Sequence, residues 1–313
     1  MDVSVVVPLY NERDNLAPLH RELDQVLRGL NRSYEILFVD DGSADGSADV
    51  LREIKAGDDA HVRVIRLARN TGQTAALACG LHRATGDIVV AIDADGENDP
   101  ADIPKLIAKL GEGYDLASGW RVARWRDSPV TRRLPSAIAN VLISRLTGVV
   151  MHDYGCTLKA YRRELAQSLM LYGEMHRFVP AIAAEQGARI VEIEVNFRPR
   201  RTGRSKYGPG RIVRTILDLM TVRFLSGYAT RPIQVFGLIG LIMGGLGAVW
   251  TAILVFEKIV LGQMLGNRPA LWLAVLLVVV GVQLVSLGLI GEMLARTYHE
   301  SQGKPVYVIK EEF

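Results

Sequence analysis

The chain has 313 residues, of which 49% are hydrophobic, and its 37 Lys and Arg residues nearly balance its 34 Asp and Glu residues. This composition fits one or two folded domains and excludes a disordered tail protein or a disulfide-stapled mini-protein. A net charge of +3, without a basic arm that carries aromatic residues, argues against nucleic acid as a partner. Cys79 and Cys156 lie among apolar residues without the spacing of a metal site, so we expect reduced cysteines in the core.

Strands and helices alternate along the first part of the chain. Apolar runs rich in β-branched residues predict four strands, at Val3–Pro8, Tyr34–Val39, Val62–Leu67 and Asp87–Ile92. Leucines at helical spacing from Leu16 to Leu30, N-cap residues before Leu51, and the run Gln73–Arg83 predict the intervening helices. This order predicts an α/β fold in which helices cover both faces of a parallel sheet.

Polar residues follow three of these strands, in the segments Pro8–Glu12, Asp40–Ser43 and Asp93–Glu97. Ligands of such sheets bind beyond the carboxyl ends of the strands. No dinucleotide-binding glycine motif follows the first strand, and no P-loop motif occurs in the chain. Asp93 and Asp95 place hard oxygen ligands on one side of an extended chain, which suits Mg²⁺ or Mn²⁺ holding a diphosphate. The motif alone is weak evidence, because an exposed acidic turn or a helix N-cap has the same letters.

Two uncharged segments, Pro232–Phe256 and Pro269–Gly291, are each long enough as helices to cross the roughly 30 Å hydrocarbon core of a bilayer. Core helices of soluble proteins seldom run this far without a charge. Four Arg residues lie between positions 210 and 231, and further basic residues follow the second segment. The positive-inside rule therefore predicts an integral membrane protein whose N-terminal domain and both termini are cytoplasmic, in the inner membrane if the source is bacterial.

These patterns predict four parts of the chain: an α/β domain at 1–208, a juxtamembrane amphipathic helix at 209–231, two transmembrane helices within 232–294, and a tail at 295–313. Ser136–Leu146 suits either a second interfacial helix or a core helix. Pro305–Ile309 is expected to form a short strand that pairs with the chain's own sheet or with another subunit. Glycines in the first transmembrane segment suit packing within the hairpin or a homo-oligomer.

Six motifs in order resemble glycosyltransferase family two, namely Val5–Glu12, Val39–Ser43, Ala68–Gln73, Ile92–Asp95, Gly119–Arg121 and Gly203–Lys206. With the two apolar segments, the resemblance covers nearly the whole chain. It narrows to the polyprenyl-phosphate glycosyltransferases, which include the dolichyl-phosphate mannose synthases and the undecaprenyl-phosphate sugar transferases. The resemblance implies a GT-A (Rossmann-like) fold, a nucleotide-sugar donor, a divalent metal, Mg²⁺ or Mn²⁺, and undecaprenyl or dolichyl phosphate as the acceptor.

The resemblance also implies roles for single residues. Implied donor-binding positions are Pro8, Tyr10, Asn11, Glu12, Val39, Asp41, Ile92, Asp93 and Ala94. Implied catalytic positions are Asp93, Asp95, Arg121, Asp153, Arg200 and Lys206. The three basic residues among them, Arg121, Arg200 and Lys206, resemble the family's residues that contact the lipid phosphate. Asp95 and Glu97 are the implied metal ligands.

Two questions remain open at this stage. Glu97 stands where the family usually has Gln, and Gly96 where it usually has Leu, which gives the loop either a further carboxylate for the metal or more flexibility. Asp153 either orients the acceptor or the sugar, or serves as a helix cap or as an ion-pair partner of Arg162.

The expected reaction depends on cations more than on a base. A phosphate monoester has a second pKa of about 6, so the acceptor is largely a dianion at neutral pH and attacks a sugar carbon without a strong general base. Donor and acceptor repel each other, so a metal and basic side chains must offset their charges. We expect inverting transfer from a UDP- or GDP-sugar to polyprenyl phosphate at the cytoplasmic membrane face, for cell-envelope glycan or lipid A modification. The alternatives are a processive polysaccharide synthase and a non-catalytic, membrane-anchored nucleotide-binding scaffold.

Overall fold

The computed structural model describes residues 1–125, 144, 148–171, 175–199, 232–261, 269–301 and 307–313. The chain divides into two compact units, Met1–Val222 together with Pro305–Phe313, and Arg223–Lys304. The expected domain boundaries at 208 and 231, the juxtamembrane helix at 209–231 and most of the segment Ser136–Leu146 lie outside the described residues.

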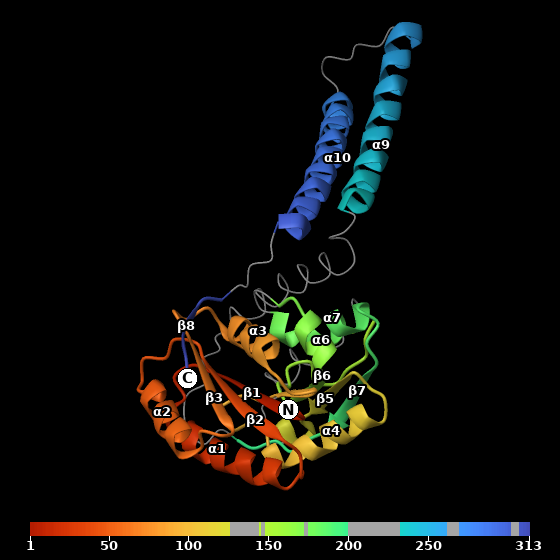
Figure 1. Cartoon of the computed structure of the whole chain (residues 1–313). Helices are drawn as coiled ribbons and strands as arrows, with labels where there is room; N and C mark the ends of the chain where they lie inside the picture. Colours follow the sequence, from red (N-terminus) through yellow and green to blue (C-terminus); the bar gives the residue numbers. More distant parts are fainter. Residues whose placement is uncertain (126–143, 145–147, 172–174, 200–231, 262–268, 302–306) are drawn as a thin grey trace. The chain divides into compact units, whose positions relative to one another are not determined.

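Four parallel strands form the centre of the first unit, in the spatial order β3, β2, β1, β4 (Figure 1). They are β1 (Val3–Leu9), β2 (Tyr34–Asp40), β3 (Val62–Leu67) and β4 (Ile88–Ala91). Every residue of β1 and β2 is buried, because helices cover both faces of the sheet. The four predicted strands are therefore confirmed, and their carboxyl ends lie at one edge of the sheet.

Four further strands make the sheet mixed rather than parallel. They are β5 (Leu116–Trp120), β6 (Lys159–Arg162), β7 (Ile190–Glu194) and β8 (Ile309–Glu312), and the full order is β7-β5-β6-β4-β1-β2-β3-β8. Strand β6 lies between β4 and β5 and is antiparallel to both, and β8 is antiparallel to β3. The prediction of a parallel sheet is wrong for these two strands, because each enters the sheet from the opposite direction.

The tail strand is also displaced from its predicted position. Strand β8 begins at Ile309, where the expected strand Pro305–Ile309 ended, and it pairs with the chain's own β3. The charged run Lys310–Glu312 carries no apolar pattern, so hydropathy gave no signal for a strand there. As an edge strand, β8 instead pairs its acidic side chains with arginines of the neighbouring elements.

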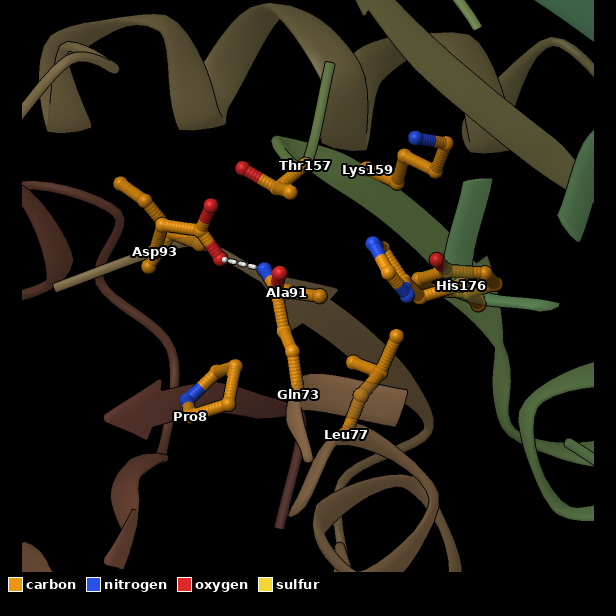
Figure 2. A pocket seen from close by; sticks show the side chains of 10 residues that line it. Pro8, Gln73, Leu77, Ala91, Asp93, Thr157, Lys159 and His176 are labelled. Carbon is orange, nitrogen blue, oxygen red and sulfur yellow. Dashed lines mark hydrogen bonds between the residues drawn. The ribbon is translucent and has the colours of Figure 1, made fainter. Parts of the chain in front are cut away.

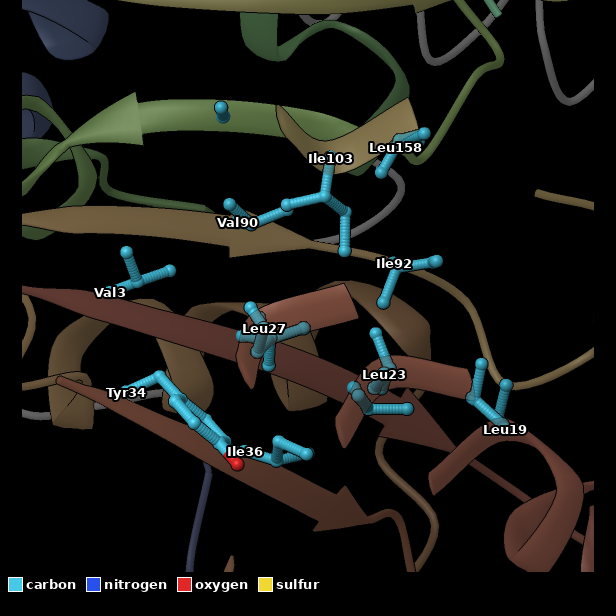
Figure 3. Packing of buried hydrophobic residues seen from close by; sticks show 14 of the residues in the cluster. Val3, Leu19, Leu23, Leu27, Tyr34, Ile36, Val90, Ile92, Ile103 and Leu158 are labelled. Atoms are coloured by element: carbon cyan, nitrogen blue, oxygen red, sulfur yellow. The ribbon is translucent and has the colours of Figure 1, made fainter. Parts of the chain in front are cut away.

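Helices cover the two faces of the sheet. Helices α1 (Arg13–Arg28), α2 (Ser47–Gly57) and α4 (Ile103–Gly111) lie on one face, and α3 (Gln73–Arg83), α6 (Arg163–Ser168) and α7 (Val179–Glu185) on the other (Figure 1). The leucines of α1 pack against β1 and β2 with side chains from α4 (Figure 3). A fully buried Leu side chain contributes about 1.5–3 kcal/mol, so this face holds the sheet rigid beneath its loops.

On the other face, α3 lies close to the sheet. A Cβ atom at Gly80 would lie 2.1 Å from Val6 Cγ1, so only glycine permits this approach. Cys79, in the same helix, and Cys156 are both buried and reduced, as the sequence predicted. The close packing holds the N-terminal end of α3 at the edge where the strands end.

The second unit contains two long apolar helices, α9 (Pro232–Leu261) and α10 (Pro269–Ser301). Their segments Phe236–Val260 and Pro269–Gly291 are long and apolar enough to cross a membrane, and only 17% of each is buried. The helices pack through glycines, since a Cβ atom at Gly281 would lie 2.6 Å from the backbone N of Gly244. The predicted pair of membrane-crossing segments is therefore present as two packed helices.

Candidate active site

Hydrogen bonds tie the loops after β1 and β2 together. Asn11 adopts a left-handed φ of +56°, which Asn tolerates better than most residues. Its backbone N donates to Ser43 Oγ at 2.9 Å, and its Oδ1 accepts from the backbone N of Ala44 at 2.9 Å. The neighbouring Glu12 accepts from Asn15 Nδ2 at 2.7 Å. The predicted donor-binding residues Asn11 and Glu12 therefore shape this edge of the sheet.

Asp41 ties the same edge to the loop after β3. Its Oδ1 accepts from the backbone N of Thr71 at 2.8 Å and from Thr71 Oγ1 at 2.9 Å, and its Oδ2 accepts from the backbone N of Gly72 at 2.8 Å. Gly72 is the N-cap of α3, so this buried carboxylate fixes where α3 begins. The sequence indicated a donor-binding role for Asp41 but not this positioning role. We call the segments 10–12, 40–43 and 71–72 the donor edge.

Two carboxylates follow β4. Asp93 is partly buried, and its Oδ1 accepts from Gln73 Nε2 at 2.8 Å (Figure 2). Burial, and then the negative charge of Asp95, raise the pKa of Asp93. Asp95 Oδ1 accepts from the backbone N of Glu97 at 3.1 Å. A cation beside these residues would offset the repulsion between the two carboxylates.

The residues fit a metal that arrives with its substrate. Within the described ranges, no group of three or more His, Cys, Asp or Glu side chains is arranged to hold a metal ion. A divalent ion held by one or two of the carboxylates after β4 would take its remaining ligands from the oxygens of a bound diphosphate and from water. This is the usual coordination of Mg²⁺ in sites that handle phosphorylated substrates. Asp95 and Glu97, both in the loop after β4, remain the predicted metal ligands.

A buried ionic network follows β5. Arg121 is 3% exposed, and its Nε and Nη2 donate to the two carboxylate oxygens of Asp153 at 2.8 and 3.2 Å. Its Nη1 donates to Glu97 Oε2 at 3.3 Å. Burial lowers the pKa of Arg121, but the attraction of Asp153 outweighs it and leaves the pKa above its ordinary value. We call Glu97, Arg121 and Asp153 the charge cluster.

The charge cluster brings together three residues that the sequence analysis selected separately. Of the alternatives left open for Asp153, the ion pair with Arg162 does not form, because Asp153 pairs with Arg121, whereas Arg162 pairs with Asp115 at 3.4 Å. Arg162 is the last residue of β6. A role of Asp153 in orienting the acceptor or the sugar stays a prediction. A bidentate pair with a carboxylate holds the Arg121 guanidinium in one orientation.

A small cavity beside Asp93 is lined in part by residues that the sequence analysis missed (Figure 2). It measures about 10 Å³, which is room for about one water molecule. Its lining includes Pro8, Ile92 and Asp93, which were predicted, and Gln73, Thr157, Lys159 and His176, which were not. The only sequence signal for Lys159 is a single charge inside the apolar run 156–161.

Lys159 is the least expected of these residues, because it is 2% exposed on β6. Its Nζ donates to the carbonyl oxygen of Cys156, and burial lowers its pKa. On the other side of the cavity, His176 Nδ1 lies 2.7 Å from Thr74 Oγ1. The β6 side of the site therefore carries a buried lysine that lines the same cavity as Asp93.

The remaining predicted positions divide into two groups. Val39 is a buried residue near the end of β2, Ala94 is buried in the turn after β4, and Tyr10 is exposed at the donor edge. Arg200 and Lys206, the other predicted phosphate contacts, lie outside the described residues. Apart from those two, the structure places every predicted site residue at the carboxyl edge of the sheet or directly after β5 and before β6.

Comparison with known proteins agrees with this arrangement. The model of the family described as glycosyl transferase family 2 matches residues 4–170. Dodecaprenyl-phosphate galacturonate synthase of Rhizobium johnstonii is 39% identical over 316 residues, which cover 100% of this chain and 93% of that protein. Undecaprenyl-phosphate 4-deoxy-4-formamido-L-arabinose transferase of Klebsiella pneumoniae is 38% identical over 309 residues, which cover 98% of this chain and 92% of that protein.

A solved structure shares the fold. Glucosyl-3-phosphoglycerate synthase from Mycobacterium tuberculosis, in complex with Mn²⁺ and UDP-glucose, aligns with a TM-score of 0.53 at 24% identity, over 71% of this chain and 78% of that chain. The mixed sheet is thus of the GT-A type, with two apolar helices added at the C-terminal side. Because the relatives match along nearly their whole length, the resemblance to polyprenyl-phosphate sugar transferases is confirmed. The chain is a glycosyltransferase and belongs to glycosyl transferase family 2.

Proposed function

We propose that this glycosyltransferase transfers a sugar from a UDP- or GDP-sugar to a polyprenyl phosphate, with inversion at the anomeric carbon and with the help of a divalent metal. The observation that carries the proposal is the junction at Glu97, which connects the carboxylates after β4 to the buried Arg121. One side of this junction suits a metal-bound diphosphate, and the other side presents a guanidinium suited to an anionic phosphate. The proposed binding positions of the two phosphorylated substrates are therefore adjacent.

The donor edge supports the nucleotide half of the proposal. Its loops are held by the side chains of Asn11, Asp41 and Ser43, so their shape is set before any ligand binds. Pre-organised loops reduce the entropy lost on binding. The solved neighbour named above was obtained with UDP-glucose, which favours a nucleotide-sugar donor. The two relatives differ in the sugar that their names contain, so the donor sugar is to be found by testing a panel.

Asp95 and Glu97 would hold the metal, which when bound supplies positive charge for the diphosphate of the donor. Mg²⁺ and Mn²⁺ both prefer the oxygen ligands present here. The Mn²⁺ named for the solved neighbour supports a divalent ion. Asp93, fixed by Gln73, is the carboxylate we assign to the sugar.

The acceptor half depends on charge. The phosphate of a polyprenyl phosphate, largely a dianion at neutral pH, attacks the anomeric carbon directly, so no strong base is needed. Arg121 offsets negative charge at this point, and we assign Arg200 and Lys206 the same task. A single in-line displacement inverts the anomeric configuration. Asp153 holds Arg121 in its orientation.

The two apolar helices support a reaction at a membrane. A polyprenyl chain leaves a bilayer only at about 0.8 kcal/mol for each exposed CH₂, so the active site must come to the membrane surface. Helices α9 and α10 are long and apolar enough to cross that membrane. We propose that the catalytic unit and both termini are cytoplasmic, and that the product serves cell-envelope glycan synthesis or lipid A modification.

The test uses the full chain purified in detergent. It is incubated with undecaprenyl or dolichyl phosphate, Mg²⁺ or Mn²⁺, and a panel of radiolabelled nucleotide sugars. We expect one labelled lipid that carries a single sugar, with the anomeric configuration opposite to that of the donor and with no product after metal chelation. Tight nucleotide binding without labelled lipid would support the scaffold alternative. A polymeric product would support a processive synthase. A product that retains the anomeric configuration of the donor would support a two-step mechanism.

A further inference from the structure

The last residues of the chain are built into the sheet that carries the donor edge. Strand β8 pairs with β3, the backbone N of Phe313 donates to the Val64 carbonyl at 2.9 Å, and the backbone N of Ala68 donates to the Val308 carbonyl at 2.9 Å. The Arg52 guanidinium lies 5.6 Å from the centroid of the Phe313 ring. Tyr307, ahead of the strand, is buried. The tail is thus a packed element of the catalytic unit.

Strand register aligns the tail with the donor edge. Leu9 on β1 lies opposite Asp40 on β2, Asp40 lies opposite Arg66 on β3, and Arg66 lies opposite Glu311 on β8. The four residues form one row across four neighbouring strands, at or near their carboxyl ends. Asp40 is the residue before Asp41 and opens the loop 40–43.

Arg66 connects the members of this row by ionic contacts. Its Nη1 lies 3.3 Å from Glu311 Oε1, its Nε lies 3.2 Å from Asp40 Oδ2, and its Nη2 donates to the carbonyl oxygen of Ser43 at 3.3 Å. Asp40 is fully buried, and its other oxygen accepts from the backbone N of Ser43 at 2.9 Å. One guanidinium therefore holds the tail, a buried carboxylate and the donor-edge loop at once.

We propose that Glu311 is a positioning residue for donor binding, which acts through Arg66 on the loop 40–43. Without the Glu311 carboxylate, Arg66 loses the contact that holds it over Asp40 and Ser43. Ser43 in turn holds the loop after β1 through the backbone N of Asn11. That this loop binds the nucleotide sugar rests on the proposed function. The connection between the tail and the loop does not.

The chain supplies a matched control in the next residue. Glu312 is on the same strand, and its side chain is as exposed as that of Glu311, at 33% against 34%. Each glutamate makes two ion pairs: Glu311 pairs with Arg66 and with Arg52, both at 3.3 Å, and Glu312 pairs with Arg63 at 2.7 Å and with Arg83 at 3.5 Å. Arg63 pairs with Glu35, the second residue of β2, which lies at the end of that strand away from the loop. Glu312 thus anchors the tail without reaching the donor edge.

The experiment compares Glu311→Gln, Glu311→Asp and Glu312→Gln in the full-length protein in detergent. We expect Glu311→Gln to raise the KM for the nucleotide sugar about threefold to fivefold, with kcat within about twofold, because the binding loop is displaced and the reacting groups are not. Glu311→Asp should restore part of the loss. Glu312→Gln should leave both constants within about twofold. Equal effects of the two Gln variants, or no effect of either, would overturn the proposal.

A second measurement does not depend on activity. Hydrogen exchange at the Ser43 amide, which is protected by Asp40, should quicken about threefold in Glu311→Gln and stay unchanged in Glu312→Gln. Unchanged exchange in Glu311→Gln would reject the connection even if the KM rose. If the wild type transfers no sugar while the exchange rates differ as expected, the proposed function fails and the positioning role stands.

Discussion

The donor edge and the charge cluster lie at the same end of the sheet but are held by different forces. At the donor edge, polar side chains are bound by backbone amides and hydroxyls, as Asp41 is by Thr71 and Gly72. In the charge cluster, buried charges bind each other, as Arg121 binds Asp153. The first arrangement fixes the shape of loops, and the second fixes a charge in a buried place.

This difference predicts different consequences of substitution. A lost hydrogen bond at a loop costs about 1–3 kcal/mol when it leaves a buried group unsatisfied. Removing one partner of a buried ion pair costs about 3–5 kcal/mol, because the other charge stays buried without compensation. Changes in the charge cluster should therefore affect folding first, and changes at the donor edge should affect donor binding first.

The largest effect is expected for Arg121→Met. The substitution keeps an unbranched side chain but leaves Asp153 buried without its bidentate partner, so the free energy of unfolding should fall by about 3–5 kcal/mol. Chemical denaturation of the full chain in detergent measures the loss. The double variant Arg121→Met with Asp153→Asn should regain stability relative to Arg121→Met, and strictly additive effects would show that the two charges are not coupled.

Asp95→Ala should come next, and it should separate binding from stability. Without this carboxylate, the metal has one ligand fewer, and the negative charges of Asp93 and Glu97 repel a less well shielded diphosphate. We therefore expect kcat/KM to fall at least about 100-fold. Unfolding should change by less than about 1 kcal/mol, because Asp95 is a partly exposed loop residue. Titration of Mn²⁺ and UDP by calorimetry measures the binding part.

The control for that variant is Asp59→Ala, at an exposed position whose carboxylate forms an ion pair with Lys55. It should leave metal and nucleotide binding unchanged. If Asp95→Ala retained the metal-dependent affinity of the wild type, Asp95 would not be a ligand.

Asp41→Asn tests the donor edge itself. An amide has one acceptor oxygen, so it cannot accept from both Thr71 and Gly72, and its NH₂ group faces a backbone N–H. We expect the KM for the donor to rise about tenfold with kcat nearly unchanged, together with a loss of about 1–3 kcal/mol in stability. The exposed Asp87→Asn is the control. A fall in kcat with constant KM would place Asp41 in the chemical step instead.

The sequence was informative wherever a local pattern decides the structure. Runs such as Val3–Pro8 predict buried strands because both faces of the sheet are covered, and strand ends then place Asp41 and Asp93 at one edge. The two apolar helices follow from length and composition alone. These features depend on residues close together in the chain.

Features that depend on distant partners were missed. Strand β8 carries charges, and only the arginines on β3 and its neighbours make it a good edge strand. Lys159 approaches Asp93 because β6 runs antiparallel beside β4, with Lys159 opposite Ala91. No local pattern reports that register. For the same reason the sequence named only Arg162 as a possible ion-pair partner of Asp153 and missed Arg121.

The smallest effect is expected for Glu97→Gln, the substitution at the boundary between the two regions. Glu97 pairs with Arg121 at 3.3 Å, but Arg121 keeps its bidentate contact with Asp153 when the charge at 97 is removed. Stability should therefore change by less than about 1 kcal/mol. The metal should lose a charged ligand, so the Mn²⁺ concentration for half-maximal rate should rise about threefold. Arg121 should gain positive potential, so the KM for polyprenyl phosphate should fall.

The opposite signs of these two shifts make the variant informative. A general disturbance of the loop would raise the Mn²⁺ requirement and the acceptor KM together, because a displaced Glu97 backbone would weaken the binding of both the metal and the acceptor. A Glu97 that serves only as an ion-pair partner of Arg121 would leave the Mn²⁺ requirement unchanged while the acceptor KM falls. Steady-state rates with varied Mn²⁺ at saturating acceptor, and with varied acceptor at saturating Mn²⁺, distinguish the three cases. Only a raised metal requirement with a lowered acceptor KM agrees with a carboxylate shared between the metal and the charge cluster.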